Sequence, residues 1–351
     1  MIEELNEHQI NDSCGPNEDL TKIENMKAYL QKYAPNFNEN YELLNLIDSG
    51  STGLVYKAKA KNSTYKQNFS FRFSFHNKMA FKNKYHGIML QKKLHHINIL
   101  KAPEYYKTSN NNFIAISEFA IYGNLDYFKR NIVKRQYLPE TFINYFTKPI
   151  LEGLNYIRRY KIIHKNINMG TIFLDFELNP KIKDFLLSFS FENLKPNDII
   201  KLPIIGTGRY MAPEVLNEKV IEIKYGDKID IYSLGVTLYN LAFGGYPYGL
   251  NNVNDDDYKK IKEKLNNEYL VFPKGYDISE MFINFLKNVL EKDYKKRYNI
   301  KEAMEDPWIK GWDIINEEKE NIGIEENLKN FFVKLKNNSI LNFNEYINNN
   351  C

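Results

Sequence analysis

The alternation of apolar and polar residues divides the chain into a strand-rich first part and a helix-rich second part. From Tyr41 to about Glu118, short alternating stretches such as YELLNLID, GLVYKAKA and NFSFRFSF predict strands. One helical stretch, from about Asn77 to Leu94, interrupts them. From Asn124 onward apolar residues recur at helical spacing, as in ETFINYFTKPILEGLNYI and EMFINFLKNVLEK. Strands followed by helices favour two packed lobes over an alternating parallel sheet.

Two flanking segments lie outside this pattern. Residues 1–40 are predicted to form a polar N-terminal extension with a short helix, which is compatible with residues 19–33 and ends before Pro35. Residues 311–351 are predicted to form a helical C-terminal tail, because GIEENLKNFFVKL and SILNFNEYI are amphipathic at helical spacing. The first residues, MIEELNEHQINDSCG, lack the basic and apolar regions of a secretory signal.

Composition excludes several classes of protein. With 351 residues, 43% of them hydrophobic, the chain can bury a large core, and a net charge of +4 is too small to predict nucleic acid binding. Two cysteines favour a reducing compartment. The most apolar stretch, Ile229 to Leu250, contains polar residues and glycines, so it predicts a buried helix and no membrane span. We therefore expect a cytoplasmic protein; cytoskeletal or ciliary placement is compatible with this composition but has no support in it.

A series of motifs follows in order along the chain. The glycine loop LIDSGSTGLVYKA is followed by LHHINIL, IIHKNIN, KDFL, GTGRYMAPE, DIYSLG and, near residue 306, DPW. Their order and spacing resemble the eukaryotic protein-kinase domain over residues 41–310, and look most like its Ser/Thr calcium/calmodulin-related branch. The resemblance implies an α+β, bilobal protein-kinase fold with a small β-rich N-lobe, residues 41–118, and a larger helical C-lobe, residues 124–310.

The positions that carry chemistry in this family hold other residue types here. By resemblance, Asn166 replaces the catalytic aspartate, Asn168 the lysine that steadies the γ-phosphate, and Thr171 the second magnesium ligand. Arg72 takes the place of the phosphate lysine and Gly87 that of the helix-C glutamate. A carboxamide cannot accept a proton and glycine cannot form an ion pair, so we expect neither a catalytic residue nor a metal site.

Positions that hold the fold together do match the family. By resemblance, Glu214 and Arg297 form a buried ion pair, and Asp230 caps the backbone of the catalytic loop. His164 and Trp308 fit packing roles. Because architecture is retained while the chemical groups are replaced, the pattern is typical of a kinase-shaped protein without kinase activity.

Whether nucleotide binds is left open by the sequence. A remnant ATP site is formed by Gly50, Gly53, Val55, Arg72 and Asp184. Against it, Phe173 falls where a smaller residue floors the adenine pocket, so its ring is expected to fill part of that space. Leu186 replaces the glycine after Phe185, which predicts one fixed backbone conformation. We therefore assign no cofactor firmly and keep ATP as an alternative.

These observations favour a catalytically inactive kinase-like protein, a pseudokinase, that is not an enzyme. Its expected role is that of a scaffold, an allosteric partner or a structural subunit of a larger assembly. The expected partners are proteins, such as an active kinase or a large cytoskeletal assembly, with no nucleic acid and no membrane. Two alternatives remain: a weak or atypical Ser/Thr protein kinase, and a nucleotide-sensing binding module.

Overall fold

The computed structural model describes residues 19–50, 53–61, 68–74, 87–101, 104–109 and 112–311. The two helices predicted in the C-terminal tail and both cysteines lie outside these residues. The chain divides into two compact units. The first unit comprises Met1–Arg135, Tyr156–Leu194 and Ile205–Thr207; the second comprises Gln136–Asn155, Lys195–Ile204 and Gly208–Cys351.

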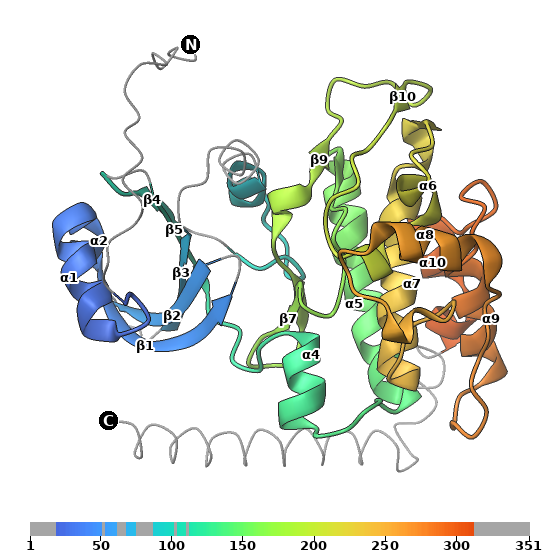
Figure 1. The fold of residues 1–351 in the computed structure, drawn as a ribbon, viewed down its shortest axis with the longest axis horizontal. Coiled ribbons are helices and arrows are strands. Elements are labelled where there is room, and N and C mark those ends of the chain that lie inside the picture. Colours follow the sequence, from blue (N-terminus) through green and yellow to red (C-terminus); the bar gives the residue numbers. More distant parts are fainter. Residues whose placement is uncertain are drawn as a thin grey trace. The chain divides into compact units, whose positions relative to one another are not determined.

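A five-stranded antiparallel sheet organises the first unit (Figure 1). Its strands are β1 (Tyr41–Gly50), β2 (Gly53–Ala60), β3 (Asn68–Ser74), β4 (Glu104–Lys107) and β5 (Phe113–Glu118), and their order across the sheet is β1-β2-β3-β5-β4. Alternation along β3 places the buried Phe71 and Phe73 on one face and Arg72 on the other. One face of this strand therefore packs into the core, and the other carries Arg72, a residue of the candidate site.

Two short helices cover the Phe71 face of the sheet. Helix α1 (Ile23–Tyr33) ends just before Pro35, as predicted, and α2 (Pro35–Asn40) begins at that proline. Figure 1 shows both helices, in blue, beside the strands. The Tyr29 ring lies 5.1 Å from that of Phe73, and the Phe37 ring lies 4.8 Å from that of Phe71. The segment predicted as a polar extension thus contributes buried side chains to the core of the sheet.

Short elements hold the loops of the first unit. Residues 87–92 are helical, within the stretch predicted as a helix; the part of that prediction before residue 87 lies outside the described residues. The remaining elements are α4 (Leu125–Tyr127), the π-helical turn η1 (Phe128–Ile132), β6 (Ile162–Ile163), β7 (Ile172–Leu174), β8 (Pro180–Ile182), the 3-10 turn η2 (Phe185–Leu187) and β9 (Phe189–Ser190). Strand β6 pairs with β9, and β7 pairs with β8. The loop that joins β6 to β7 is therefore held by a paired strand at each end.

The second unit is mainly helical. Its elements are α6 (Pro213–Leu216), α7 (Asp227–Phe243), α8 (Tyr258–Asn267), α9 (Glu280–Val289), α10 (Ile300–Glu305), the strands β10 (Ile199–Ile200) and β11 (Ile221–Glu222), and the 3-10 turns η3 (Gly208–Tyr210), η4 (Ile223–Tyr225) and η5 (Leu250–Asn252). Helix α5 (Glu140–Arg159) begins in this unit and ends in the first. Every residue of α7 is buried, which explains the apolar stretch that begins at Ile229. Among the described helices, none combines the length and the apolar character needed to cross a membrane.

The sheet and the helices together confirm the predicted α+β class. The boundaries of the flanks and lobes stay predictions.

Candidate functional site

The loop between β6 and β7 brings together the three catalytic-loop positions singled out in the sequence. The Asn166 Oδ1 atom accepts a hydrogen bond from the Thr207 hydroxyl at 3.1 Å and one from the Asn168 amide at 3.2 Å. The Asn168 Oδ1 atom accepts from the Gly170 N–H at 2.7 Å. The Thr171 hydroxyl donates to the Asn166 carbonyl at 2.9 Å. The polar side chains of the loop thus satisfy one another, and the loop has a defined shape.

His164 lies at the start of this loop, and its Nδ1 atom accepts a hydrogen bond from the Asn166 N–H at 3.3 Å. Its side chain is fully buried, its Nε2 atom lies 3.1 Å from the Lys183 carbonyl, and its ring packs edge-on against Phe185 at 4.9 Å. Burial lowers the pKa of His164 from 6.5 to about 4. The ring is therefore neutral at neutral pH, which suits the packing role predicted for it.

This buried histidine makes stability depend on pH. The unfolded chain binds a proton at His164 near pH 6.5, whereas the folded chain binds it only near pH 4, so acid favours unfolding between these values. We expect the free energy of unfolding to fall by up to about 1.4 kcal/mol per pH unit as the pH drops from 6.5 toward 4. Chemical denaturation at several pH values measures this slope. It should be shallower in His164→Phe, and an equal slope in both proteins would contradict the assignment.

Arg72 and Asp184 face each other across the site. Arg72 lies directly opposite Val55 in the β2–β3 pair, so the two side chains share one face of the sheet. The Arg72 Nη1 atom lies 3.9 Å from the Asp184 Oδ2 atom. Asp184 has a left-handed backbone, φ 74°, and its Oδ1 atom accepts a bond from the Leu186 N–H at 3.4 Å. Three of the five residues predicted as a nucleotide remnant are placed here.

The other two residues of that predicted remnant form the end of the β1–β2 hairpin. Gly50 pairs with Gly53, whose φ of 127° is a backbone conformation that residues other than glycine rarely adopt. Residues 51–52, at the tip of the hairpin, lie outside the described residues.

Gly87 lies where its backbone approaches the backbone of Phe185 and Leu186 closely. A Cβ atom added there would lie 2.3 Å from the Phe185 carbonyl oxygen and 2.6 Å from the Leu186 Cα atom. A glutamate therefore has no room at this position while Phe185 and Leu186 keep their places in η2.

The close approach predicts a large cost for adding one methyl group. We expect Gly87→Ala to lower the free energy of unfolding by about 1–3 kcal/mol, because backbone must shift to admit the Cβ atom. Denaturant titration measures the change. Gly311→Ala is the matched control, since Gly311 is also helical and its added Cβ atom would meet only the end of Met281, at 3.4 Å. Equal stabilities for the two variants would contradict the packing argument.

Lys183 was not among the residues predicted from the sequence. Its side chain is buried, and its ammonium lies 4.8 Å from the centre of the Phe173 ring, over the ring face. Burial, followed by the nearby positive charge of Arg72, lowers the pKa of Lys183 to about 7. The signal in the sequence was its place directly before Asp184. The half-buried ring of Phe173 thus has a cation over it, and its predicted role in filling an adenine pocket stays a prediction.

The residues predicted to hold the architecture lie mostly in the second unit. Arg297 donates to both carboxylate oxygens of Glu214, at 2.7 and 2.9 Å, and both side chains are fully buried. Asp230 is buried within α7. The Trp308 ring stacks on Phe282 at 4.4 Å.

By resemblance, Asp184 and Thr171 stand at the two magnesium-ligand positions, but the residues here do not fit a pair of magnesium ions. The Thr171 hydroxyl and the Asn168 side-chain oxygen Oδ1 are engaged within the loop, and Asp184 faces the positive charge of Arg72. Among the described residues, no group of three or more His, Cys, Asp or Glu side chains is placed to hold a metal ion. We therefore derive no catalytic step through a metal.

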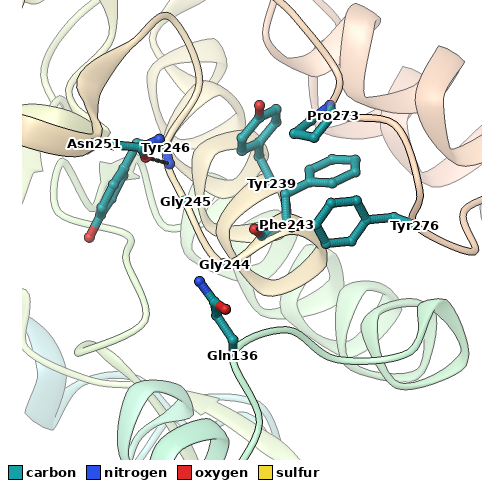
Figure 2. Close-up of a pocket in the computed structure, with 9 residues that line it drawn as sticks. All are labelled: Gln136, Tyr239, Phe243, Gly244, Gly245, Tyr246, Asn251, Pro273 and Tyr276. Atoms are coloured by element: carbon teal, nitrogen blue, oxygen red, sulfur yellow. Dashed lines mark hydrogen bonds between the residues drawn. The ribbon is translucent and has the colours of Figure 1, made fainter.

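The second unit contains a separate pocket that the sequence did not predict. It has a volume of about 440 Å³ and is lined by Gln136, Tyr239, Phe243, Gly244, Gly245, Tyr246, Asn251, Pro273 and Tyr276. Figure 2 shows the Tyr239, Phe243 and Tyr276 rings gathered on one side and Gln136 apart from them. The Asn251 side chain accepts a hydrogen bond from the Tyr246 N–H at 2.6 Å, which fixes the turn that follows α7.

Curated relatives of this chain are protein kinases. The cell cycle serine/threonine-protein kinase CDC5/MSD2 of Saccharomyces cerevisiae is 30% identical over 224 residues, which cover 64% of this chain and 30% of that protein. Calcium-dependent protein kinase 4 of Plasmodium berghei is 28% identical over 296 residues, or 82% of this chain and 52% of that protein. A calcium/calmodulin-dependent protein kinase kinase of Caenorhabditis elegans is 30% identical over 223 residues, covering 63% and 39%. The chain thus spans between 30% and 52% of the length of these relatives.

These findings correct one prediction. The chain was predicted not to be an enzyme, and that prediction is wrong, because its relatives are named as protein kinases and a kinase domain is present. The finding favours the alternative of a Ser/Thr protein kinase over an inactive scaffold. The protein kinase domain family matches residues 41–309, which is more than half of the sequence. This chain therefore belongs to the protein kinase domain family.

Proposed function

We propose that this chain is an ATP-dependent Ser/Thr protein kinase with an atypical catalytic site. The observation that carries the proposal is the placement of Arg72 and Asp184 opposite each other, within a domain whose relatives are Ser/Thr protein kinases. A guanidinium at this position supplies the positive charge that a phosphoryl donor requires, in a planar fork that matches phosphate oxygens.

The ordered loop supports the positioning part of catalysis. Phosphoryl transfer depends mainly on holding donor and acceptor in line and on stabilising the transferred charge. The Asn166 side chain is fixed by Thr207 and Asn168, so its carboxamide is positioned to hydrogen-bond a substrate hydroxyl. It cannot take the proton of that hydroxyl, so in the proposed step the proton passes to a phosphate oxygen while the bond to the leaving group, ADP, breaks. Because general-base help contributes about 10²–10⁴ in rate, the proposed kinase is slow.

The proposal is tested by phosphate transfer from labelled ATP to Ser/Thr protein substrates. We expect slow transfer by the purified chain and a loss of at least about tenfold in Arg72→Met, since about 1.4 kcal/mol of charge stabilisation accounts for that factor. Arg130→Met is the matched control, because Arg130 is exposed and pairs only with Asp126 among the described residues. No transfer by the unmodified chain, or equal transfer by Arg72→Met, would overturn the proposal.

A further inference from the structure

The candidate site holds a guanidinium with a buried nitrogen that no described residue hydrogen-bonds. The Arg72 Nε atom is buried and has no partner among the described residues. The Nη1 atom is 3.9 Å from Asp184, which is an ion pair but is too long for a hydrogen bond. The Arg72 side chain is 22% exposed, so water reaches little of it. A buried donor left unpaired is costly, and a ligand that accepts its hydrogen bond removes the cost.

Lys183 adds a second basic group to the same site, and burial lowers its pKa to about 7, so it is partly protonated at neutral pH. Its buried ammonium lies over the Phe173 ring, and its charge is close enough to Arg72 and Asp184 to interact with both. The other carboxylate nearby, Glu118, lies 3.3 Å from Lys181 and accepts a hydrogen bond from the Lys101 N–H at 3.1 Å. Among the described residues, Asp184 is the carboxylate that acts on both Arg72 and Lys183, while Glu118, which also acts on Lys183, is paired with Lys181. Buried charges are normally compensated, so the site is short of an anion.

A divalent cation is a poor candidate to complete this site. In the part of the chain that the structure describes, Asp184 is the one carboxylate that pairs with Arg72, and a metal ion bound there would lie against a guanidinium. The neighbouring oxygens of Asn168 and Thr171 are already used inside the loop. Hard cations such as magnesium need several free oxygen ligands, which these residues do not supply.

We infer that Arg72 and Lys183 bind the phosphates of a nucleotide directly, without a divalent cation. The nucleotide class rests on the proposed function; the charge arrangement does not. Arg72 provides a fork of donors for two phosphate oxygens, and Lys183 provides a compact charge over the Phe173 ring. In this arrangement Asp184 competes with the phosphates for Arg72.

Calorimetric titration of the full chain with adenosine, ADP and ATP in EDTA tests this inference. We expect affinity to rise from adenosine to ADP to ATP, because each added phosphate meets the two cations. Adding magnesium should leave the Kd of ATP within about threefold or weaken it, a free-energy change below about 1 kcal/mol. Equal affinities for adenosine and ATP, or a Kd that tightens by about tenfold or more with magnesium, would overturn the inference.

Variants locate the contacts. Arg72→Met and Lys183→Met should each weaken ATP binding in EDTA by at least about tenfold and leave adenosine binding unchanged. Asp184→Asn should tighten ATP binding in EDTA, because it removes the competing carboxylate; a site built on a metal ion predicts the opposite in magnesium. Arg130→Met is the control for the loss of an arginine. If Lys183→Met fails to fold, as judged by its thermal melt, Arg72→Met and Asp184→Asn test the inference without it. Weaker ATP binding by Asp184→Asn in EDTA would contradict the inference.

The outcomes separate this inference from the proposed kinase activity. Metal-free ATP binding without any phosphate transfer would refute the kinase and keep the inference. ATP binding and phosphate transfer that both require magnesium would refute the inference and keep the kinase. Absence of ATP binding with and without magnesium would refute both.

Discussion

Replacing Asn166 by aspartate is expected to raise the rate of phosphate transfer by about 10²–10⁴. The carboxylate of Asn166→Asp can accept the same hydrogen bonds from Thr207 and Asn168 that the carboxamide oxygen accepts now. The loop should therefore keep its shape and gain a group that takes the substrate proton. Single-turnover measurement with labelled ATP and a Ser/Thr substrate reports the rate of the transfer step itself.

Asn267→Asp is the control for this experiment, since it adds the same charge at an exposed residue of the second unit. Its rate should equal that of the unmodified chain. A rate for Asn166→Asp that stays within about threefold of the unmodified chain would show that the missing base does not limit transfer. The low rate would then lie with the other replaced positions, Gly87 foremost.

Breaking the ion pair of Glu214 and Arg297 is expected to have the largest effect on stability. We predict that Arg297→Met lowers the free energy of unfolding by about 3–5 kcal/mol. The side chains are 0% and 1% exposed, so the Glu214 charge would be left in the interior without its two hydrogen bonds from Arg297. Denaturant titration of the purified variant gives the value.

Two comparisons support the interpretation of that loss. The double variant Glu214→Met with Arg297→Met removes both charges and should recover part of the stability, because no uncompensated charge remains. Lys264→Met breaks the exposed pair with Glu268, which spans 3.0 Å, and should cost below about 1 kcal/mol. A cost for Arg297→Met as small as that for Lys264→Met would contradict the buried-pair argument.

The strands and the order of the motifs could be predicted because they depend on local patterns. Alternation along NFSFRFSF predicted strand β3, and Pro35 predicted the end of α1. The packing of Tyr29 and Phe37 on that sheet could not be predicted, because each ring contacts a strand far away in the sequence. The residues around Tyr29 and Phe37 in the sequence are also mostly polar, so the segment was interpreted as an extension.

In the site, too, the positions of residues could be predicted from the sequence, but their contacts could not. Spacing along the chain identified Arg72 and Gly87, but not why each residue occupies its position. The close backbone approach at Gly87 and the cation over Phe173 arise from contacts between separate elements, which no spacing rule describes. Counting the replaced catalytic groups led to the prediction of a non-enzyme, which the family match and the named kinases among the relatives correct.

The most direct test of the account follows the phosphate itself. The purified chain and Arg72→Met, prepared in parallel, are incubated with ATP carrying heavy oxygen in its γ-phosphate and with a library of Ser, Thr and Tyr peptides, and labelled products are read by mass spectrometry. The account predicts slow formation of labelled phosphoserine and phosphothreonine by the unmodified chain, with at least about tenfold less from Arg72→Met. No labelled peptide from the unmodified chain, or equal amounts from both proteins, would contradict it.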